Sequence, residues 1–414
     1  MAGSLGWLMV EMNRAPEVEL PAAPKRSMTV SVGTQSSVLG SPVSEPSQDS
    51  EKRVAASLQI QPLNVPDAIP GEALLTFRTP GALAAFRDRA AALGLEVLGF
   101  DVRLRTARVR TGDSRSLEKD LSEHAEDYTH VGPNLFVRVP GLPVETDLAN
   151  EGGRVPFESQ GLDRIGAPAV RNGWGQGVTV AVIDSGIAAH PSLKSADITH
   201  VDLVGDGSEW NGHGTAMASL IAGNDPRVGG VAPAAKLIDI RVTDAKGESN
   251  VALLSSAIVK AADLGARVIN ISLGSASSTP MLEEAVRYAQ SRHVVIVAAA
   301  GNEKQTALSM PAGLPGVLSV AAVDAGGKQA WFSNSGAGLT LAAPGVGIVS
   351  GYADSKVVIG SGTSQATAIT SGAVAYLLGR GYSSANVIPL LTRSAAPLSA
   401  PAEAVGAGLL QLPK

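Results

Sequence analysis

Four apolar runs in the second half of the chain constrain its fold more than any other feature. They read VTVAVID (178–184), KLIDIRV (236–242), RVINISL (267–273) and VVIVAAA (294–300). Near-continuous apolar runs of this length are typical of strands that are buried on both faces of a parallel sheet. Helical patterns rich in alanine lie between them. The sequence therefore predicts an α/β domain in which helices flank a doubly wound, mostly parallel sheet.

A different pattern precedes this domain. Between residues 71 and 140 the expected elements follow the order strand, helix, strand, strand, helix, strand, with the helices at 80–94 and 114–128. This order is that of a small ferredoxin-like α+β domain. The sequence is therefore divided into four parts, which are a disordered Ser- and Pro-rich segment (1–66), the ferredoxin-like domain (67–142), a linker (143–160) and the α/β domain (161–414).

Composition excludes several classes of function. The net charge is −5 and no long basic run is present, so a nucleic-acid partner is not expected. The chain has no cysteine, which excludes disulfides, thiolate zinc sites and a cysteine nucleophile. No stretch reaches the apolar length of a membrane span. The first thirty residues do not resemble a good secretory signal.

Four polar residues stand at the ends of the predicted elements. Asp184 closes the first apolar run, and Asn302 follows the fourth. His213 falls in the first turn of the helix in NGHGTAMASLIAG, and Ser364 opens the helix SQATAITSGAVAYLL. In α/β sheets of this kind, active sites lie beyond the carboxyl ends of the strands. We therefore expect these four residues to lie near one another.

Each of the four residues also has a purely structural interpretation. Asp184 can form an Asx-turn, His213 can be a surface residue in a capping loop, Ser364 can cap its helix, and Asn302 can be a turn residue. Taken together, however, they supply a carboxylate, a base, a nucleophile and an amide donor. Nucleophilic acyl transfer requires this set of groups.

The segments around these residues resemble a known family. AVIDSGIAAHPSL, NGHGTAMASLIAG and GSGTSQATA resemble the Asp, His and Ser motifs of the subtilases, the subtilisin-like serine proteases, in the same chain order. The likeness runs from about residue 162 to about residue 378. It implies that Asp184 orients His213, that His213 acts as base and then as acid, and that Ser364 attacks the peptide carbonyl. It also implies that Asn302, in VAAAGNE, holds the oxyanion together with the Ser364 N–H.

The resemblance implies further contacts with the substrate. Ser272, Leu273 and Gly274 match the edge of the family that pairs with the substrate backbone. Ala300 and Gly301 match the wall of the pocket for the residue before the cleaved bond. The structural interpretation of the first segment is the end of a buried strand, which is compatible with this role. Glu248, near the opposite edge, suggests a preference for basic residues a few positions before the cut.

The family also implies a zymogen. VGPNLFVRVPG resembles the end of a propeptide, so the ferredoxin-like domain is expected to block the active site; an unrelated accessory domain is the alternative. The expected partners of this monomer are a polypeptide substrate and its own propeptide domain. No cofactor or metal ligand is assigned, and NDPRVG is shorter than the loop that holds a structural calcium in some subtilases. The resemblance to the subtilases implies secretion, but the first thirty residues do not resemble a secretory signal.

Three other functions compete with a serine endopeptidase. A catalytically silent or propeptide-blocked homologue would bind peptides without turnover. The same triad could transfer the acyl group to a peptide amine and so ligate peptides. An esterase or lipase is excluded, because those enzymes use a G-x-S-x-G elbow and the chain order Ser, acid, His, whereas here the serine comes last.

Overall fold

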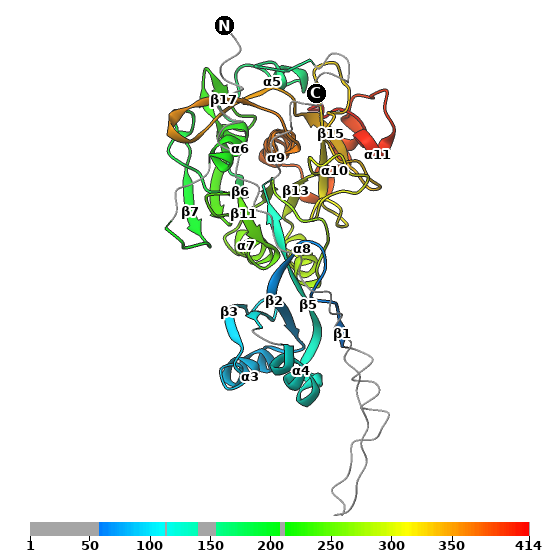
Figure 1. Ribbon diagram of the computed structural model, residues 1–414. Helices are drawn as coiled ribbons and strands as arrows, with labels where there is room; N and C mark the ends of the chain where they lie inside the picture. The colour runs from blue at the N-terminus through cyan, green and yellow to red at the C-terminus, as the bar shows by residue number, and fades with distance from the viewer. Residues whose placement is uncertain (1–57, 112–113, 140–154, 208–211, 414) are drawn as a thin grey trace, which may run out of the picture.

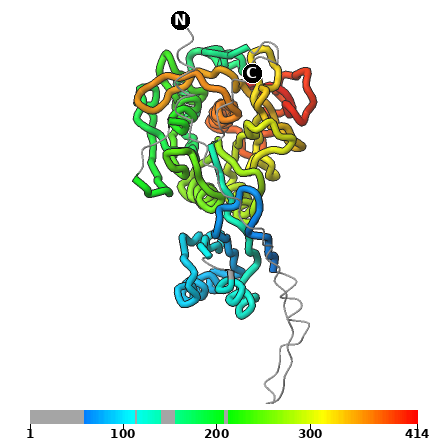
Figure 2. The backbone as a smooth tube through the Cα atoms, in the orientation of Figure 1, coloured from blue at the N-terminus to red at the C-terminus, as the bar shows by residue number. Residues whose placement is uncertain are grey.

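The computed structural model describes residues 58–111, 114–139, 155–207 and 212–413, and most of the predicted disordered segment and linker lies outside these ranges (Figure 1). The backbone trace in Figure 2 shows a small N-terminal body below a larger one. Within the described residues, no helix combines the length and apolar character needed to cross a membrane.

The larger body is built on the predicted parallel sheet. Its seven strands follow the order β15-β14-β13-β12-β6-β10-β7 and all of their pairings are parallel. The four apolar runs form β6, β10, β12 and β13 in its interior. The bounds are β6 (Thr179–Asp184), β7 (Ile198–Asp202), β10 (Lys236–Arg241), β12 (Val268–Ile271), β13 (Val295–Ala299), β14 (Leu318–Val323) and β15 (Leu341–Pro344).

Helices cover both faces of this sheet, as the prediction of a doubly wound fold requires. Figure 1 shows α6 (His213–Ala222) and α9 (Thr363–Gly379) on one side, and α7 (Val251–Asp263) and α8 (Pro280–Ser291) on the other. Nearly every residue of α9 is buried, which its small Ala, Ser, Thr and Gly side chains allow. Shorter elements complete the domain: α5 (Gly161–Arg164), β8 (Asn224–Asp225), β9 (Val228–Gly229), β11 (Glu248–Asn250), β16 (Ile348–Gly351), β17 (Val357–Gly360), α10 (Ser384–Ser394) and α11 (Ala402–Val405).

The smaller body contains an antiparallel sheet in the order β5-β2-β4-β3, with β1 parallel to β5 at its edge. Its aromatic core joins Phe77 to Phe86 and to Tyr128, with ring centroids 5.1 and 4.8 Å apart. The bounds are β1 (Gln59–Ile60), β2 (Ala68–Phe77), α3 (Pro80–Ala90), β3 (Glu96–Asp101), β4 (Thr106–Arg110), α4 (Ser114–Glu123) and β5 (Tyr128–Arg138).

Two predicted boundaries differ from the structure. Gln59–Ile60 form a strand against β5, although residues up to 66 are predicted to be disordered. Phe157, in the predicted linker, is only 2% exposed, and its N–H donates to Val346 O (3.0 Å). Neither segment has a sustained hydrophobic period, because a two-residue strand and a single anchoring aromatic side chain are too short to produce one.

Glu72 and His130 are titratable side chains that the small domain buries. Although burial raises the pKa of Glu72, hydrogen bonds from Arg108 and Asn134 and the charges of both Arg108 and Arg110 hold that pKa below its usual value. His130 is 5% exposed, and neither of its ring nitrogens has a hydrogen-bond partner among the described residues. Burial lowers the pKa of His130 from its ordinary 6.5, while the Glu283 carboxylate opposes this shift.

Acidification below about pH 6.5 is therefore expected to destabilise the small domain. The unfolded chain takes up a proton at His130 that the folded domain resists, so stability is fully present above the unfolded pKa and is lost as pH falls. Hydrogen exchange of the full-length Ser364→Ala chain should show amide protection in β2 and β5 falling by at most about tenfold per pH unit. His130→Leu should remove this loss; an unchanged loss in that variant would contradict the explanation.

Candidate active site

The carboxyl ends of three neighbouring strands carry polar residues. Asp184 is the last residue of β6, Ser272 directly follows β12, and Asn302 lies three residues beyond β13. Because β13, β12 and β6 are adjacent and parallel, these residues lie along one edge of the sheet. Two helices also begin with predicted site residues, since His213 starts α6 and Ser364 is the second residue of α9.

Asp184 and His213 form a direct pair. The Nδ1 atom of His213 lies 2.9 and 3.0 Å from the two carboxylate oxygens of Asp184. The Asp184 side chain is fully buried and that of His213 is 16% exposed. An imidazole that donates its Nδ1–H to a carboxylate keeps the lone pair on Nε2. This pair can therefore accept a proton at Nε2.

The loop that follows Asp184 is fastened to the start of α6. Ser185 Oγ accepts the Gly214 N–H (3.0 Å), and Thr215 Oγ1 accepts the Ala188 N–H (2.8 Å). A Cβ at Gly214 would lie 2.5 Å from a backbone oxygen of the same loop. Glycine at this position therefore permits the close approach that brings the imidazole to the carboxylate.

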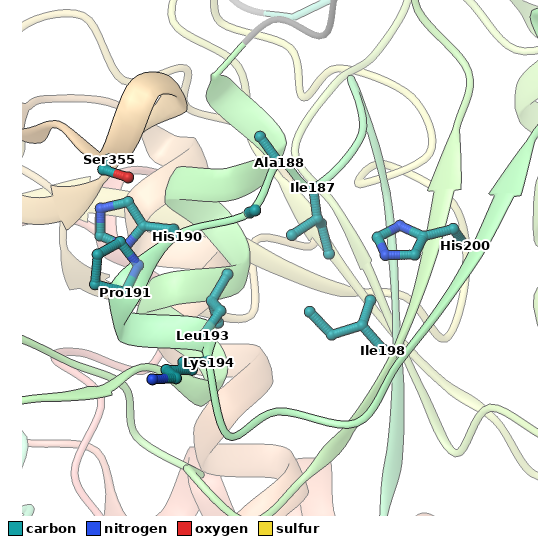
Figure 3. Close-up of a pocket in the computed structure, with 10 residues that line it drawn as sticks. Ile187, Ala188, His190, Pro191, Leu193, Lys194, Ile198, His200 and Ser355 are labelled. Carbon is teal, nitrogen blue, oxygen red and sulfur yellow. The ribbon is translucent and has the colours of Figure 1, made fainter.

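The same loop is also fastened to β10. Asp239 is 1% exposed, and its Oδ2 accepts the Ile187 N–H (3.0 Å) and lies 2.8 Å from His200 Nδ1. Burial raises the pKa of Asp239, assisted by the charge of Asp184, and the hydrogen bonds from Ile187 and His200 only partly offset this. Ile187 and His200 line a mostly apolar pocket of about 550 Å³ (Figure 3). The sequence analysis did not identify either member of the Asp239–His200 pair.

Ser364 does not cap its helix. The N-cap of α9 is Gly362, which has no side chain to cap the helix. Instead, Ser364 Oγ donates to the carbonyl oxygen of Ser272 (3.3 Å), and the Ser272 hydroxyl donates to Ser364 O (3.4 Å). The structure records no hydrogen bond between Ser364 and His213. The structure thus joins the carboxylate to the imidazole and brings the serine to the same edge of the sheet.

A buried polar chain holds Ser364 against the sheet. Asn270 Nδ2 donates to Ser272 Oγ (3.0 Å), and Ser371 Oγ donates to Asn270 Oδ1 (2.9 Å). All three side chains are fully buried. This chain was not predicted from the sequence. Asn270, which interrupts the apolar run of β12, is the one signal that could have indicated it.

Asn302 is oriented by the first residue of α9. Its Oδ1 accepts both the N–H (3.0 Å) and the hydroxyl (2.8 Å) of Thr363. The Nδ2 atom lies 3.2 Å from the position that a Cβ at Gly362 would occupy. Glycine there leaves room beside the amide donor. Gly301, with φ +108°, has no room for a side chain, because a Cβ would collide with Asn334 and Ser309.

Backbone contacts already occupy much of the predicted substrate-binding segments. Gly274 exchanges both of its backbone hydrogen bonds with Arg138 of β5, each at 3.1 Å. Leu273 is 2% exposed, as expected for the end of a buried strand. Ala300 O accepts the Ser309 N–H (2.9 Å), and the Gly301 N–H donates to Thr363 Oγ1 (3.3 Å).

The last strand of the small domain enters the large domain beside the catalytic candidates. Beyond its contact with Gly274, β5 pairs antiparallel with β11, and the Val139 N–H donates to Gly247 O (3.0 Å). The end of β5 thus lies between two backbone segments of the large domain. Its side chains Leu135 and Val137 are buried in the core of that domain.

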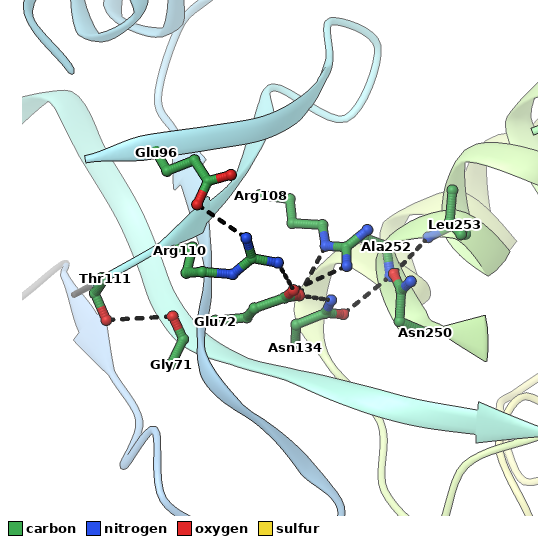
Figure 4. Close-up of polar contacts among 10 residues, drawn as sticks. All are labelled: Gly71, Glu72, Glu96, Arg108, Arg110, Thr111, Asn134, Asn250, Ala252 and Leu253. Atoms are coloured by element: carbon green, nitrogen blue, oxygen red, sulfur yellow. Dashed lines mark hydrogen bonds and ion pairs between the residues drawn. The ribbon is translucent and has the colours of Figure 1, made fainter. Parts of the chain in front are cut away.

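A polar network extends this junction (Figure 4). Asn134 Nδ2 donates to Glu72 Oε2 (2.8 Å), while its Oδ1 accepts the Ala252 N–H at the start of α7 (3.3 Å). Arg108 donates to both oxygens of Glu72 (2.8 and 3.0 Å). The buried carboxylate therefore fixes the amide that contacts the first turn of α7.

Within the described residues, no three His, Asp or Glu side chains lie close enough together to hold a metal ion.

Comparison with known proteins gives consistent sequence matches. The model of the subtilase family matches residues 175–408. Subtilisin Savinase from Lederbergia lenta is 39% identical over 232 residues, which are 55% of this chain and 86% of that protein. M-protease from Shouchella clausii is 39% identical over 276 residues, or 66% of this chain and 71% of that protein.

Solved structures match as well. Fervidolysin from Fervidobacterium pennivorans, described as a keratinolytic enzyme related to subtilisin, superposes with a TM-score of 0.74 at 24% identity. That match covers 86% of this chain and 62% of fervidolysin, and it establishes the fold. A mutant of the PatA protease domain matches with a TM-score of 0.55 at 32% identity, covering 59% of this chain and 95% of that domain.

The tie between the Asp184 loop and α6 can be tested through stability. Ser185→Ala leaves the buried Gly214 N–H without its acceptor, which should lower the free energy of unfolding by about 1–3 kcal/mol. Denaturant unfolding in a Ser364→Ala background measures this change. Ser291→Ala, which removes an exposed hydroxyl bonded to Tyr288 O, should change it by less than about 0.5 kcal/mol. Equal effects of the two variants would contradict the assigned contact.

Proposed function

The chain belongs to the subtilase family, which makes it a subtilisin-like serine endopeptidase, and we propose that it cleaves peptide bonds through Asp184, His213 and Ser364. The observation that supports this assignment is the 2.9 Å contact between Asp184 and His213 at the edge of the sheet where α9 presents Ser364. The three groups would act as orienting carboxylate, base and nucleophile.

The reaction would proceed in two steps. Ser364 Oγ attacks the peptide carbonyl carbon while His213 Nε2 removes the hydroxyl proton, and the same proton then goes to the leaving amine. Water hydrolyses the resulting acyl-enzyme by the same proton transfers in reverse order. Asp184 holds the Nδ1–H tautomer and stabilises the imidazolium through the two short contacts of that pair.

The serine must reorient before it attacks. Its hydroxyl donates to Ser272 O, so a rotation about the Cα–Cβ bond would direct it away from Ser272 and toward His213. Catalytic hydrogen bonds are often long or misaligned in a free enzyme and shorten only with substrate bound. The bond to Ser272 therefore represents a resting orientation of the nucleophile.

The oxyanion that forms during attack would lie beside Asn302. Its Oδ1 is held by Thr363, which leaves the Nδ2 end of the amide on the side of Gly362. The Ser364 N–H, at the positive end of α9, would supply the second donor. Because Gly362 has no side chain, no Cβ separates the two donors; the atom nearest to that position is Gln365 Oε1, at 2.7 Å, which a substrate oxygen would displace.

The small N-terminal domain would act as an inhibitory propeptide. The end of β5 makes the antiparallel backbone pairing expected of a substrate, through Gly274 on one side and Gly247 on the other. Its Leu135 and Val137 are buried in the large domain, and Asn134 contacts the start of α7. A substrate could not use these edges while β5 occupies them.

Removing the amide of Asn302 should impair the chemical step. Asn302→Leu is expected to lower kcat by about 10²–10³, which is the loss known for the equivalent donor of subtilisin rather than a value derived for this chain. Thr363→Val is the matched control, because it removes the hydroxyl that anchors Asn302 but keeps the amide; it should cost no more than about tenfold. Steady-state kinetics on a peptide substrate would distinguish the two. Equal losses would argue against an oxyanion role.

Self-processing tests the zymogen and the silent-homologue alternative together. The register of β5 against Gly274, continued toward Ser272 and Ser364, predicts cleavage within three residues after Val139. Mass spectrometry of the wild type should find this cut, and a fluorophosphonate probe should label Ser364. The Ser364→Ala chain should remain whole and unlabelled. A wild type that neither cuts itself nor reacts with the probe would instead support a silent, peptide-binding homologue.

A further inference from the structure

Glu248 faces an arginine across the candidate substrate edge. In the pairing of β11 with β5, Glu248 lies directly opposite Arg138. The Nε atom of Arg138 is 3.5 Å from Glu248 Oε1. Directly opposed side chains on an antiparallel pair lie on the same face of the sheet and interact. The catalytic domain thus places a carboxylate where one side chain of the bound strand projects.

Side chains alternate along the end of β5, and Arg138 points to the opposite face of the strand from Val137. Val137 is fully buried in the large domain, whereas Arg138 is 48% exposed. Successive side chains of a strand point to opposite faces. A peptide bound in the same register would therefore bury the residue before this position and project the residue at this position toward Glu248.

The charges around Arg138 come from both domains. Its guanidinium also lies 3.4 Å from Asp67 and 4.6 Å from the ring centre of Phe136, both in the small domain. On its other flank lies Gly274, which has no side chain. Among the described residues, Glu248 is the charged group of the catalytic domain that pairs with Arg138, so a substrate side chain in the place of Arg138 would meet it.

A tight turn presents Glu248. Asp244 Oδ1 accepts the N–H groups of Lys246 and Glu248, each at 2.9 Å, and the Asp244 N–H donates to Glu248 O (2.9 Å). Gly247 completes the turn with φ +81°. The backbone of Glu248 is thus held in place before any peptide binds, so little ordering is required of it on binding.

From this geometry, we propose that Glu248 makes the enzyme select polypeptides with arginine or lysine at the position that pairs with Gly274. In the structure, Arg138 of the chain's own small domain occupies this position and faces Glu248. The proposal rests on the proposed function, because it takes the end of β5 as a guide to how a substrate lies.

Peptides copied from residues 134–143 test the proposal. Variants of NLFVRVPGLP carry Arg, Lys, Gln or Glu at the position of Arg138 and are cleaved by the wild-type enzyme after self-processing and removal of the cut small domain. An exposed cross-strand charge pair contributes about 0.2–1 kcal/mol. We therefore expect kcat/KM to be about 1.4- to fivefold higher for Arg than for Gln, and lower still for Glu. Salt at 1 M should reduce the difference through screening.

Variants of the enzyme assign the preference to one side chain. Glu248→Gln should remove the discrimination between Arg and Glu peptides, and Glu248→Lys should reverse it. Glu284→Lys, which changes an exposed charge on α8 paired with Arg287, should leave the wild-type preference intact. Glu248→Gln preserves the shape of the side chain, so the test does not depend on the charge-reversed protein folding well.

The outcomes separate this proposal from the proposed function. If all four peptides are cleaved at equal rates while the probe still labels Ser364, the enzyme assignment stands and selection by Glu248 is wrong. If the preference survives in Glu248→Gln, another group causes it and the proposal is also wrong. If no peptide is cleaved and Ser364 does not react, the proposed function fails, and this inference fails with it.

Discussion

The site depends on one constraint, which is that three neighbouring, buried parallel strands end at the same edge of the sheet. Adjacent parallel strands bring their carboxyl ends together, so Asp184, Ser272 and Asn302 become neighbours although many residues separate them along the chain. The return segments then place the starts of α6 and α9 above this edge. Helix starts present unpaired N–H groups and a positive dipole end. A carboxylate-bearing sheet edge facing two helix starts is suited to holding negative charge.

Burying so many polar groups would destabilise the domain unless each one found a partner. Around the site the structure supplies many of these partners locally, within chains of short hydrogen bonds, although Asp239 Oδ1 and Gln365 Oε1 have none among the described residues. Ser371 and Asn270 link α9 to β12 and end at Ser272, while Ser185 and Thr215 link the Asp184 loop to α6. A buried hydrogen-bonded group that loses its partner costs about 1–3 kcal/mol. These chains therefore act as supports, because a shift of either helix would break several of them at once and would move His213 or Ser364.

Much of this arrangement could be predicted from the sequence, for identifiable physical reasons. Uninterrupted apolar runs correctly predict the interior strands, because strands buried on both faces need apolar side chains throughout. The motifs around Asp184, His213 and Ser364 predict one shared edge, where the structure places them. Contacts between residues far apart in the chain, in contrast, produce neither an apolar run nor a motif in the sequence. Asp239 and Ser371 read as isolated polar residues, and Phe157 reads as part of a linker. The family resemblance leads us to expect that the end of the small domain blocks the site, but the individual contacts of β5 with the large domain could not be predicted, because they depend on how the two domains dock.

Because the two domains dock in this way, the eleven residues of β5 contribute to two hydrophobic cores. Its first half, through Tyr128 and Val131, completes the core of the small domain, and its second half, through Leu135 and Val137, enters the core of the large one. Burying these last two side chains contributes about 1.5–3 kcal/mol each as an upper bound. The backbone pairs with Gly247 and Gly274 add to this. A cut beyond Val139 would leave all of these contacts intact. Breaking one peptide bond would therefore not by itself free the substrate edge, and the small domain would have to unfold or be degraded first.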